Sequence, residues 1–290
     1  MAHRHDRRDT GRARSAALTL LLAALAMTGC APAVPATDKM QHDRPRPTIV
    51  SLNPCLDAIL VEIAAPGQVL ALSHYSRDPA SSSIAPEVAA RHRFTGGSAE
   101  EVIALRPDLV LASIFLPAPT RRALEAAGLK VATFGSPTSI AQSAAQVREV
   151  ARLARREGAG AALAARIAAR PAPPPGPAPR ALLWQPGEIT AGEATLIAQL
   201  LREAGFASHA AARGLGQADR VSLEQVLADP PQVLLIAGDE AGQRHPVLRA
   251  GLPGTHIARF DPRLLYCGGP TIPRARARLA AIRAAAIRQP

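Results

Sequence analysis

Short apolar runs and helix-like periodic segments alternate along much of this chain. Apolar runs predict strands at 48–52, 69–73, 109–113 and 130–134. The third run is continuously apolar over four residues, as in a parallel strand that is buried on both faces. Segments with helical apolar periodicity lie between the runs, near 57–65, 98–106 and 119–128. This alternation predicts βα units around a parallel sheet.

A long helical stretch separates this first block from a second one. It covers about 139–170, with a break expected near Gly158 and Gly160. The Pro-rich segment 171–179 cannot be helical, because proline lacks the N–H and fixes φ, so it should run extended. The alternation then restarts, with strands expected at 181–185, 233–237 and 256–260 and helices near 193–205, 222–228, 243–250 and 271–287. Two such blocks predict two lobes with a ligand cleft between them.

The first residues have the pattern of an export signal. Residues 1–14 carry five Arg and two Asp, and an apolar run of 12 residues follows at 16–27. That run is too short to span a bilayer, which takes about 20 residues, and is typical of a secretory signal peptide. Met27–Cys30 resembles a bacterial lipobox, in which Cys30 accepts the lipid; the alternative is an ordinary signal peptide with an incidental cysteine. We therefore expect a signal peptide over 1–29, a flexible tether over 30–47, and a periplasmic protein that is lipid-anchored to a membrane.

Composition and charge narrow the class of protein. Hydrophobic residues make up 48% of the chain, which is enough for a sizeable core. The net charge of +11 comes almost entirely from arginines scattered among Ala and Leu, so it indicates solvated helix surfaces and no nucleic-acid partner. The sequence has no G-x-G-x-x-G after a strand, no P-loop, no G-x-S-x-G and no histidine spacing of a metal site. No cofactor and no metal site are predicted.

Two cysteines remain after Cys30 is assigned to lipidation. They are Cys55 and Cys267, which lie far apart in the sequence. Outside the cytoplasm such a pair is usually oxidised. The sequence leaves two alternatives open, a disulfide or separate thiols that contact a ligand or a soft metal.

Four segments resemble the Fe/B12 periplasmic-binding family, which comprises substrate-binding proteins of ABC importers. They are Thr48–Pro54, Ser73–Pro79, Gly97–Leu111 and Val221–Ile236. The third is the most specific, with Arg-Pro-Asp-Leu-Val leading into a strand, and the fourth resembles the same unit in the second lobe. The likeness covers about 48–287. It implies an α/β fold of two Rossmann-like lobes with central parallel sheets, an N-terminal lobe over 48–157, a bridging helix plus Pro-rich segment over 158–179, and a C-terminal lobe over 180–290.

The resemblance also implies a function and partners. The protein would capture a metal chelate or corrinoid, such as cobalamin or a ferric siderophore, and deliver it to an inner-membrane permease with its ATPase. It would not be an enzyme. Three alternatives remain open: a haem-binding protein of the same family, an exported α/β enzyme that uses Ser113, His74 and Asp78, and a scaffold lipoprotein without a transport role.

Six residues are the expected ligand contacts. Tyr75 matches a tyrosine that lines the vitamin B12 site, and Tyr266 falls near an aromatic position of the B12 binder. Gly96 stands where the B12 binder has a tryptophan, which weighs against corrin stacking. From residue type alone, Arg263 would meet an anionic ligand and His74 could ligate haem iron together with Tyr75. The remaining two are Trp184, expected to point into the cleft after the first strand of lobe two, and Phe115.

Two acidic residues match the permease-docking positions of the family, in which one acidic residue at the tip of each lobe pairs with permease arginines. They are Glu100 and Glu224, each just inside a helix that leads into a buried strand. An exposed glutamate near a helix N-terminus is also favoured by the helix dipole alone. The occurrence of a matching pair favours docking.

Overall fold

The computed structural model describes residues 45–172 and 174–288. The predicted signal peptide, Cys30 and most of the tether lie outside the described residues. The chain from Arg46 onward forms one compact unit. No helix in the described ranges is both long enough and apolar enough to span a membrane.

The first lobe is built on a five-stranded parallel sheet in the order β3-β2-β1-β4-β5. All four strands expected here are confirmed, and the two-residue β3 was too short to predict. In the centre of the sheet, Val50 of β1 pairs with Ala71 on one side and Val110 on the other. The strands are β1 (Ile49–Ser51), β2 (Val69–Ser73), β3 (Phe94–Thr95), β4 (Leu109–Ser113) and β5 (Lys130–Phe134).

Local capping signals start the first long helix. The side chain of Asn53 accepts hydrogen bonds from the backbone N–H groups of Cys55 and Leu56, and Pro54 occupies the first helical position. Its missing N–H leaves nothing unsatisfied there. The helices of this lobe are α3 (Pro54–Ile63), the 3-10 turn η1 (His74–Arg77), α4 (Pro86–Ala89), α5 (Ala99–Leu105) and α6 (Ala118–Ala126).

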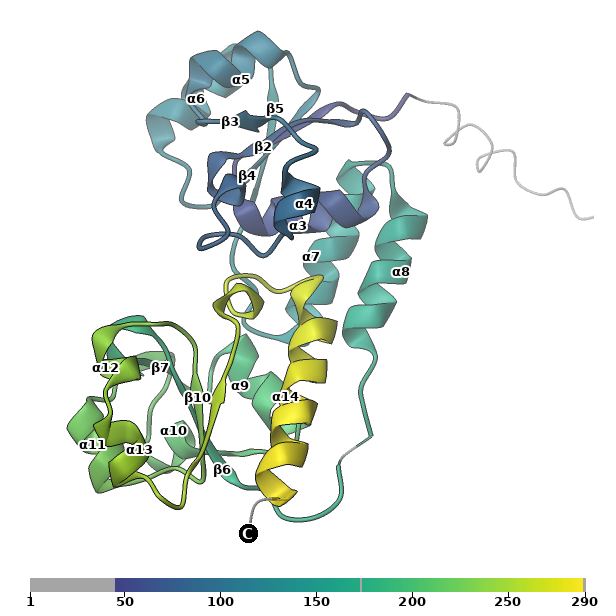
Figure 1. Ribbon diagram of the computed structural model, residues 1–290. Helices are drawn as coiled ribbons and strands as arrows, with labels where there is room; N and C mark the ends of the chain where they lie inside the picture. The colour runs from purple at the N-terminus through teal and green to yellow at the C-terminus, as the bar shows by residue number, and fades with distance from the viewer. Residues whose placement is uncertain (1–44, 173, 289–290) are drawn as a thin grey trace, which may run out of the picture. The chain divides into compact units, whose positions relative to one another are not determined.

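A pair of helices, α7 (Ile140–Leu153) and α8 (Glu157–Ala168), connects the two lobes (Figure 1). The break lies between them, where Arg155 adopts a φ of 53°. The break expected near Gly158 and Gly160 was therefore misplaced by a few residues. Gly160 lies inside α8 and faces α7, where a Cβ would come within 2.1 Å of the Ala151 Cβ. The absence of a side chain at Gly160 therefore lets the two helices approach closely. The described residues of 171–179 contain no helix, as predicted.

The second lobe contains a six-stranded mixed sheet in the order β11-β10-β6-β7-β9, with β8 also paired to β6. Its central strands are parallel, and β7 and β9 are joined by antiparallel pairing. The three predicted strands are confirmed, and the three additional strands are only two or three residues long. The strands are β6 (Arg180–Trp184), β7 (Ile189–Ala191), β8 (Ala207–Ser208), β9 (Ala218–Arg220), β10 (Val233–Ile236) and β11 (His256–Arg259).

The helix expected over 243–250 is in fact two short helices. Pro246 lies between them, and proline cannot continue the hydrogen-bonding pattern of a preceding helix. The helical elements of the second lobe are the 3-10 turns η2 (Pro186–Glu188) and η3 (Pro262–Leu264), and α9 (Leu196–Glu203), α10 (His209–Ala212), α11 (Leu223–Ala228), α12 (Ala241–Arg244), α13 (Val247–Gly251) and α14 (Thr271–Arg288).

One hydrophobic core extends through both lobes and the connecting helices. It includes Ile49 of β1, Val147 of α7, Leu163 of α8, Leu183 of β6 and Leu279 of α14. α14 packs against both α8 and α9. Because the lobes share this core, their junction is a packed layer of apolar side chains. The fold is α/β with two lobes and central sheets of mainly parallel strands, as the sequence predicted.

Candidate functional site

A cavity of about 230 Å³ lies where loops of the two lobes meet. From lobe one come the start of α3 and the loop after β5, and the connecting helix α7 contributes one side chain. From lobe two come the start of α9, the loop before β9 and the loop before α14. The lining residues are Asn53, Cys55, Leu56, Phe134, Gly135, Ser136, Pro137, Thr138, Gln146, Thr195, Leu196, Gln217, Leu265, Tyr266, Cys267 and Gly268.

The carboxyl ends of the strands position much of this surface. Asn53 follows β1, the segment 135–138 follows β5, and the turn that carries Tyr75 follows β2. In open parallel sheets ligands bind outside these ends, because the loops there converge on one edge. The same edge of lobe one therefore carries both the cavity wall and the Tyr75 turn.

Tyr75 is the most prominent predicted ligand contact. Its side chain is 53% exposed, and the ring of His74, also exposed, lies beside it with a centroid separation of 4.0 Å. The loop that follows reaches lobe two, where Ser83 Oγ donates to the carbonyl of Arg263 at 2.9 Å. Tyr75 thus lies eight residues before a contact between lobe one and lobe two.

A buried carboxyl group lies behind this turn. Asp57 of α3 is fully buried, and its Oδ2 accepts hydrogen bonds from Ser73 N at 3.0 Å and Ser76 Oγ at 2.6 Å. Burial raises the pKa of the Asp57 carboxyl to about 7, although the hydrogen bonds from Ser76 and Ser73 lower it in part. Its other oxygen, Oδ1, is outside hydrogen-bonding geometry with every described group.

The structure joins Cys55 and Cys267 in a disulfide, with their Cα atoms 5.1 Å apart. The bond links the first turn of α3 in lobe one to the loop before α14 in lobe two. Tyr266, the residue before Cys267, is 45% exposed and lines the cavity. Two residues after Cys267, Gly269 N donates to Ser143 Oγ of α7 at 2.6 Å, so this loop is attached both to lobe one and to the connecting helix α7.

Phe115 and Arg263 differ in their surroundings. Phe115 follows β4 and is 80% exposed, and the neighbouring Ile114 is also exposed. The guanidinium of Arg263 is hydrogen-bonded to both oxygens of Asp261, at 2.8 to 3.2 Å, and this contact lowers the pKa of the Asp261 carboxyl. An anionic ligand at Arg263 would have to compete with that carboxylate.

The structure contradicts the predicted role of Trp184. Its side chain is 1% exposed, its indole N–H donates to the carbonyl of Val221 at 2.8 Å, and it packs among Val226 and Leu234. β6 is a central strand, and Trp184 lies in the separate core formed with α11 and α13. Trp184 is therefore a core residue of lobe two and not a ligand contact.

Glu100 and Glu224 occupy equivalent positions in the two lobes. Each is the second residue of a short helix with a serine cap: Ser98 accepts from Glu101 N in α5, and Ser222 accepts from Gln225 N in α11. Both glutamates are exposed, and neither forms an ion pair with any described residue. The neighbouring Glu101 instead binds its own lobe through Thr95 Oγ1 and Gly96 N.

The residues of the enzyme alternative do not form a hydrogen-bonded cluster. Ser113 Oγ accepts from Phe115 N, and Asp78 accepts from Ala80 N and Ser81 Oγ, while His74 stacks on Tyr75. Within residues 45–172 and 174–288, no group of three His, Cys, Asp or Glu side chains is placed to hold a metal ion.

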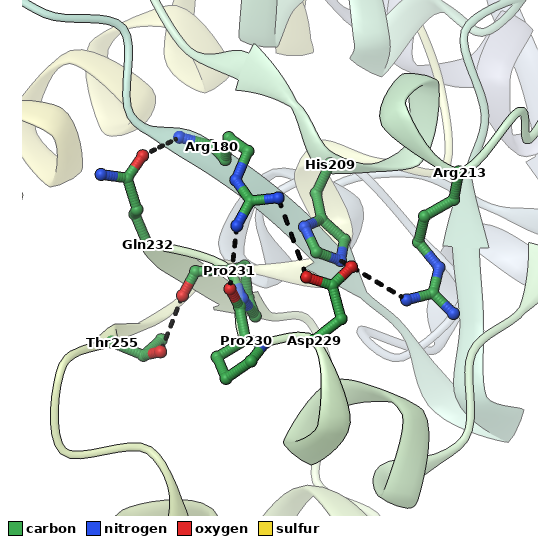
Figure 2. A network of polar contacts seen from close by, with 8 residues as sticks. All are labelled: Arg180, His209, Arg213, Asp229, Pro230, Pro231, Gln232 and Thr255. Atoms are coloured by element: carbon green, nitrogen blue, oxygen red, sulfur yellow. Dashed lines mark hydrogen bonds and ion pairs between the residues drawn. The ribbon is translucent and has the colours of Figure 1, made fainter.

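A second polar cluster lies at the other end of the lobe-two strands (Figure 2). There Asp229 Oδ2 accepts from Arg213 Nη1 at 3.3 Å and lies 3.5 Å from His209 Nε2, while Arg180 Nη1 lies 3.8 Å from Asp229 Oδ1. Burial is the main cause that lowers the pKa of His209. Arg180 is the first residue of β6, so the cluster lies at the amino end of that strand, away from the carboxyl-end loops.

Sequence reasoning missed several of these features. The segment 135–138 could have been found by the rule that ligands bind after parallel strands, because it follows a correctly predicted strand. Asp57 had a weaker signal, one acid in the otherwise apolar first turns of PCLDAILVEI. That the Ser73 amide and the Ser76 hydroxyl converge on it depends on tertiary packing.

Comparison with known proteins places the chain in a family. A family model described as periplasmic binding protein matches residues 49–247. No curated protein matches the sequence.

Solved structures of the same fold are numerous. The periplasmic haem-binding protein RhuT from Roseiflexus sp. RS-1 is 24% identical with a TM-score of 0.64, covering 83% of this chain and 98% of that one. The periplasmic haem-binding protein HutB of Vibrio cholerae is 17% identical with a TM-score of 0.66, covering 81% and 98%. The periplasmic vitamin B12-binding protein BtuF of Vibrio cholerae is 18% identical with a TM-score of 0.62, covering 84% and 99%. At these identities the likeness establishes the fold.

Proposed function

The chain belongs to the periplasmic binding protein family, and from this premise we propose that it is the substrate-binding component of an ABC importer for a metal tetrapyrrole, haem or cobalamin. Members of this family bind substrates for transport and are not enzymes. The observation that carries the proposal is a pair of tyrosines, each about half exposed, one from each lobe. Similar structures described as haem-binding and B12-binding proteins support the same ligand class.

The size of the cavity is consistent with a ligand that extends beyond it. Typical ligand pockets have about 300–1,000 Å³, whereas this cavity has about 230 Å³. A tetrapyrrole bound at Tyr266 would extend beyond the cavity, and Tyr75 and Phe115 are exposed aromatic rings on loops that follow strands of lobe one. Aromatic rings favour such a partner because they offer large apolar faces, and the Tyr75 phenol next to His74 also offers donor atoms for iron.

Titration of residues 31–290 with hemin, cyanocobalamin and ferrichrome, followed by absorption and calorimetry, tests the ligand class. Saturable one-to-one binding of hemin or cyanocobalamin below about 1 μM supports the proposal. Tyr75→Phe should abolish a phenolate–iron absorption band with hemin but leave cyanocobalamin affinity within about twofold, because the ring remains. Binding of ferrichrome alone, or of none of the three, would overturn the tetrapyrrole assignment.

We further propose that Glu100 and Glu224 dock the protein on its permease. Their equivalent positions and unpaired carboxylates suit arginine partners, and the Ser222 hydroxyl keeps the pKa of Glu224 below its usual value. The variant Glu100→Arg/Glu224→Arg should lose at least about tenfold in affinity for the permease and keep its ligand affinity. Glu157→Arg is the control, because Glu157 is also exposed in the first turn of a helix. Equal losses in both variants would contradict docking at these sites.

Membrane attachment through Cys30 is a separate proposal, supported by the lipobox-like Met27–Cys30. Expression of the full chain with a labelled fatty acid should label the wild-type protein, and Cys30→Ser should leave it unlabelled and released from the membrane fraction. Label that persists in Cys30→Ser would refute the assignment.

A chain that binds its ligand but associates with no permease would favour the scaffold alternative.

A further inference from the structure

The segments that carry Tyr75 and Tyr266 are both attached to the first turn of α3. Cys55 in that turn forms the disulfide with Cys267, the neighbour of Tyr266. Asp57 connects it to the turn that carries Tyr75, since Ser73 and Ser76, which flank His74 and Tyr75, both donate to Asp57 Oδ2. The first link is covalent, whereas the second depends on a group that can gain or lose a proton.

The Tyr75 turn has little support of its own. η1 has four residues, and a single 3-10 turn of this length is weakly stabilised by its internal hydrogen bonds. Ser73 Oγ accepts from Tyr75 N at a long 3.4 Å. The shorter bonds from Ser76 Oγ, at 2.6 Å, and Ser73 N, at 3.0 Å, end on the Asp57 carboxyl group. The turn also packs against β3, where the Arg77 guanidinium lies 5.1 Å from the centre of the Phe94 ring. Among its hydrogen bonds, however, the shortest side-chain contact ends on the Asp57 carboxyl group, so the orientation of Tyr75 depends in part on that group.

We propose that Asp57 is a positioning residue whose ionisation fixes the Tyr75 turn and thereby makes ligand capture depend on pH; the second part rests on the proposed function. Hydrogen bonds to an ionised carboxylate are shorter and about twice as strong as those to a neutral group. Ionised Asp57 therefore holds both serine donors firmly. Protonated Asp57 accepts the same bonds more weakly and leaves the turn looser.

Several charged side chains lie on α3, on η1 and on the elements packed against them. They are His74 and Arg77 on η1, Glu62 on α3, Glu87 on α4, Arg148, Glu149 and Arg152 on α7, and Glu157 and Arg166 on α8, with Arg156 at the N-cap of α8. No described ion pair or hydrogen bond joins any of them to Asp57; Glu62 pairs with Arg166, and Arg156 donates to the Ile63 carbonyl. Histidine side chains change charge in the same pH range, so each measurement is repeated with His74→Gln.

The amide resonance of Ser73 in the ligand-free protein, residues 31–290, tests the first part. Between about pH 5 and 9, its chemical shift should titrate with a single midpoint, also in His74→Gln. Ser76→Ala removes a donor that favours the ionised form, so the midpoint should move to higher pH. In the His74→Gln background, Asp57→Asn should abolish the titration, and the control Glu62→Gln, an exposed acid of the same helix, should keep it. A Ser73 amide that does not titrate in His74→Gln, or that still titrates in Asp57→Asn/His74→Gln, overturns the proposal.

Ligand titrations with hemin and cyanocobalamin as probes test the second part. Affinity for cyanocobalamin should fall about fivefold on protonation of Asp57 in the wild-type protein and in Glu62→Gln, and should be independent of pH in Asp57→Asn. Hemin binding at Tyr75 also releases the phenol proton, so for hemin the same change of about fivefold is the difference between the pH profiles of the wild type and Asp57→Asn. If the Ser73 amide titrates but the ligand affinity of the wild-type protein does not change with pH, the proposed dependence of ligand binding on Asp57 is refuted. If neither probe binds, the proposed function fails, and the amide titration still decides whether Asp57 holds the turn.

Discussion

Removal of the Cys55–Cys267 disulfide should markedly destabilise the fold. The two cysteines are separated by 212 residues, so the bond closes a very long loop. Chain-entropy arithmetic for such a loop gives about 5 kcal/mol at 25 °C. The Gly269–Ser143 hydrogen bond and the shared core still hold the lobes together without it. We therefore expect Cys55→Ser/Cys267→Ser to lose about 2–5 kcal/mol of unfolding free energy and to retain its native secondary structure.

Urea denaturation of residues 31–290 measures this loss. Trp184 is the single tryptophan and lies in the lobe-two core, so its fluorescence follows that lobe, while circular dichroism follows both lobes. A reductant should bring the wild-type midpoint down to that of the double variant and should leave the variant unchanged. The reasoning is refuted if the oxidised wild type and the variant unfold at the same urea concentration, or if alkylation finds two free thiols in the oxidised protein.

Three further predictions concern single positions. The folded-state pKa of Asp57 is about 7 against an ordinary 3.8, so the folded chain keeps a proton that the unfolded chain releases between these values. The free energy of unfolding should therefore fall by about 4 kcal/mol as the pH rises from about 4 to about 7, and urea denaturation of Asp57→Asn should lack this slope. Trp184→Ala should cost about 3–5 kcal/mol of stability and leave the affinity of the folded protein for its ligand unchanged. A loss of ligand affinity in calorimetry without a loss of stability would show that Trp184 contacts the ligand. Gly160→Ala should cost about 1–3 kcal/mol because its Cβ would meet Ala151, whereas Gly158→Ala, which has open space, should gain about 0.5–1 kcal/mol in thermal denaturation; equal effects would contradict the close helix contact.

Local sequence patterns were sufficient for most of the fold. The apolar run Leu109–Ala112 predicts a buried parallel strand because both faces of such a strand must be apolar. Ser98 and Ser222 mark helix starts because a capping hydroxyl satisfies backbone N–H groups within three residues. Pro246 separates α12 from α13 for an equally local reason, which the single helix expected over 243–250 overlooked. Each of these effects acts between near neighbours in the chain, so the residues themselves carry the information.

The candidate site depends on contacts between distant segments. Trp184 was expected in the cleft because it ends a strand, but the helices packed on β6 enclose it in the lobe-two core. The meeting of Cys55 with Cys267, and of Asp57 with the Ser73–Ser76 turn, follows from how α3 packs against β2, α7 and the loop before α14. The sequence by itself determined the elements and the family, because these depend on local periodicity and motifs. Only the tertiary structure decided which side chains are exposed at the cleft, because burial depends on which distant surfaces cover each face.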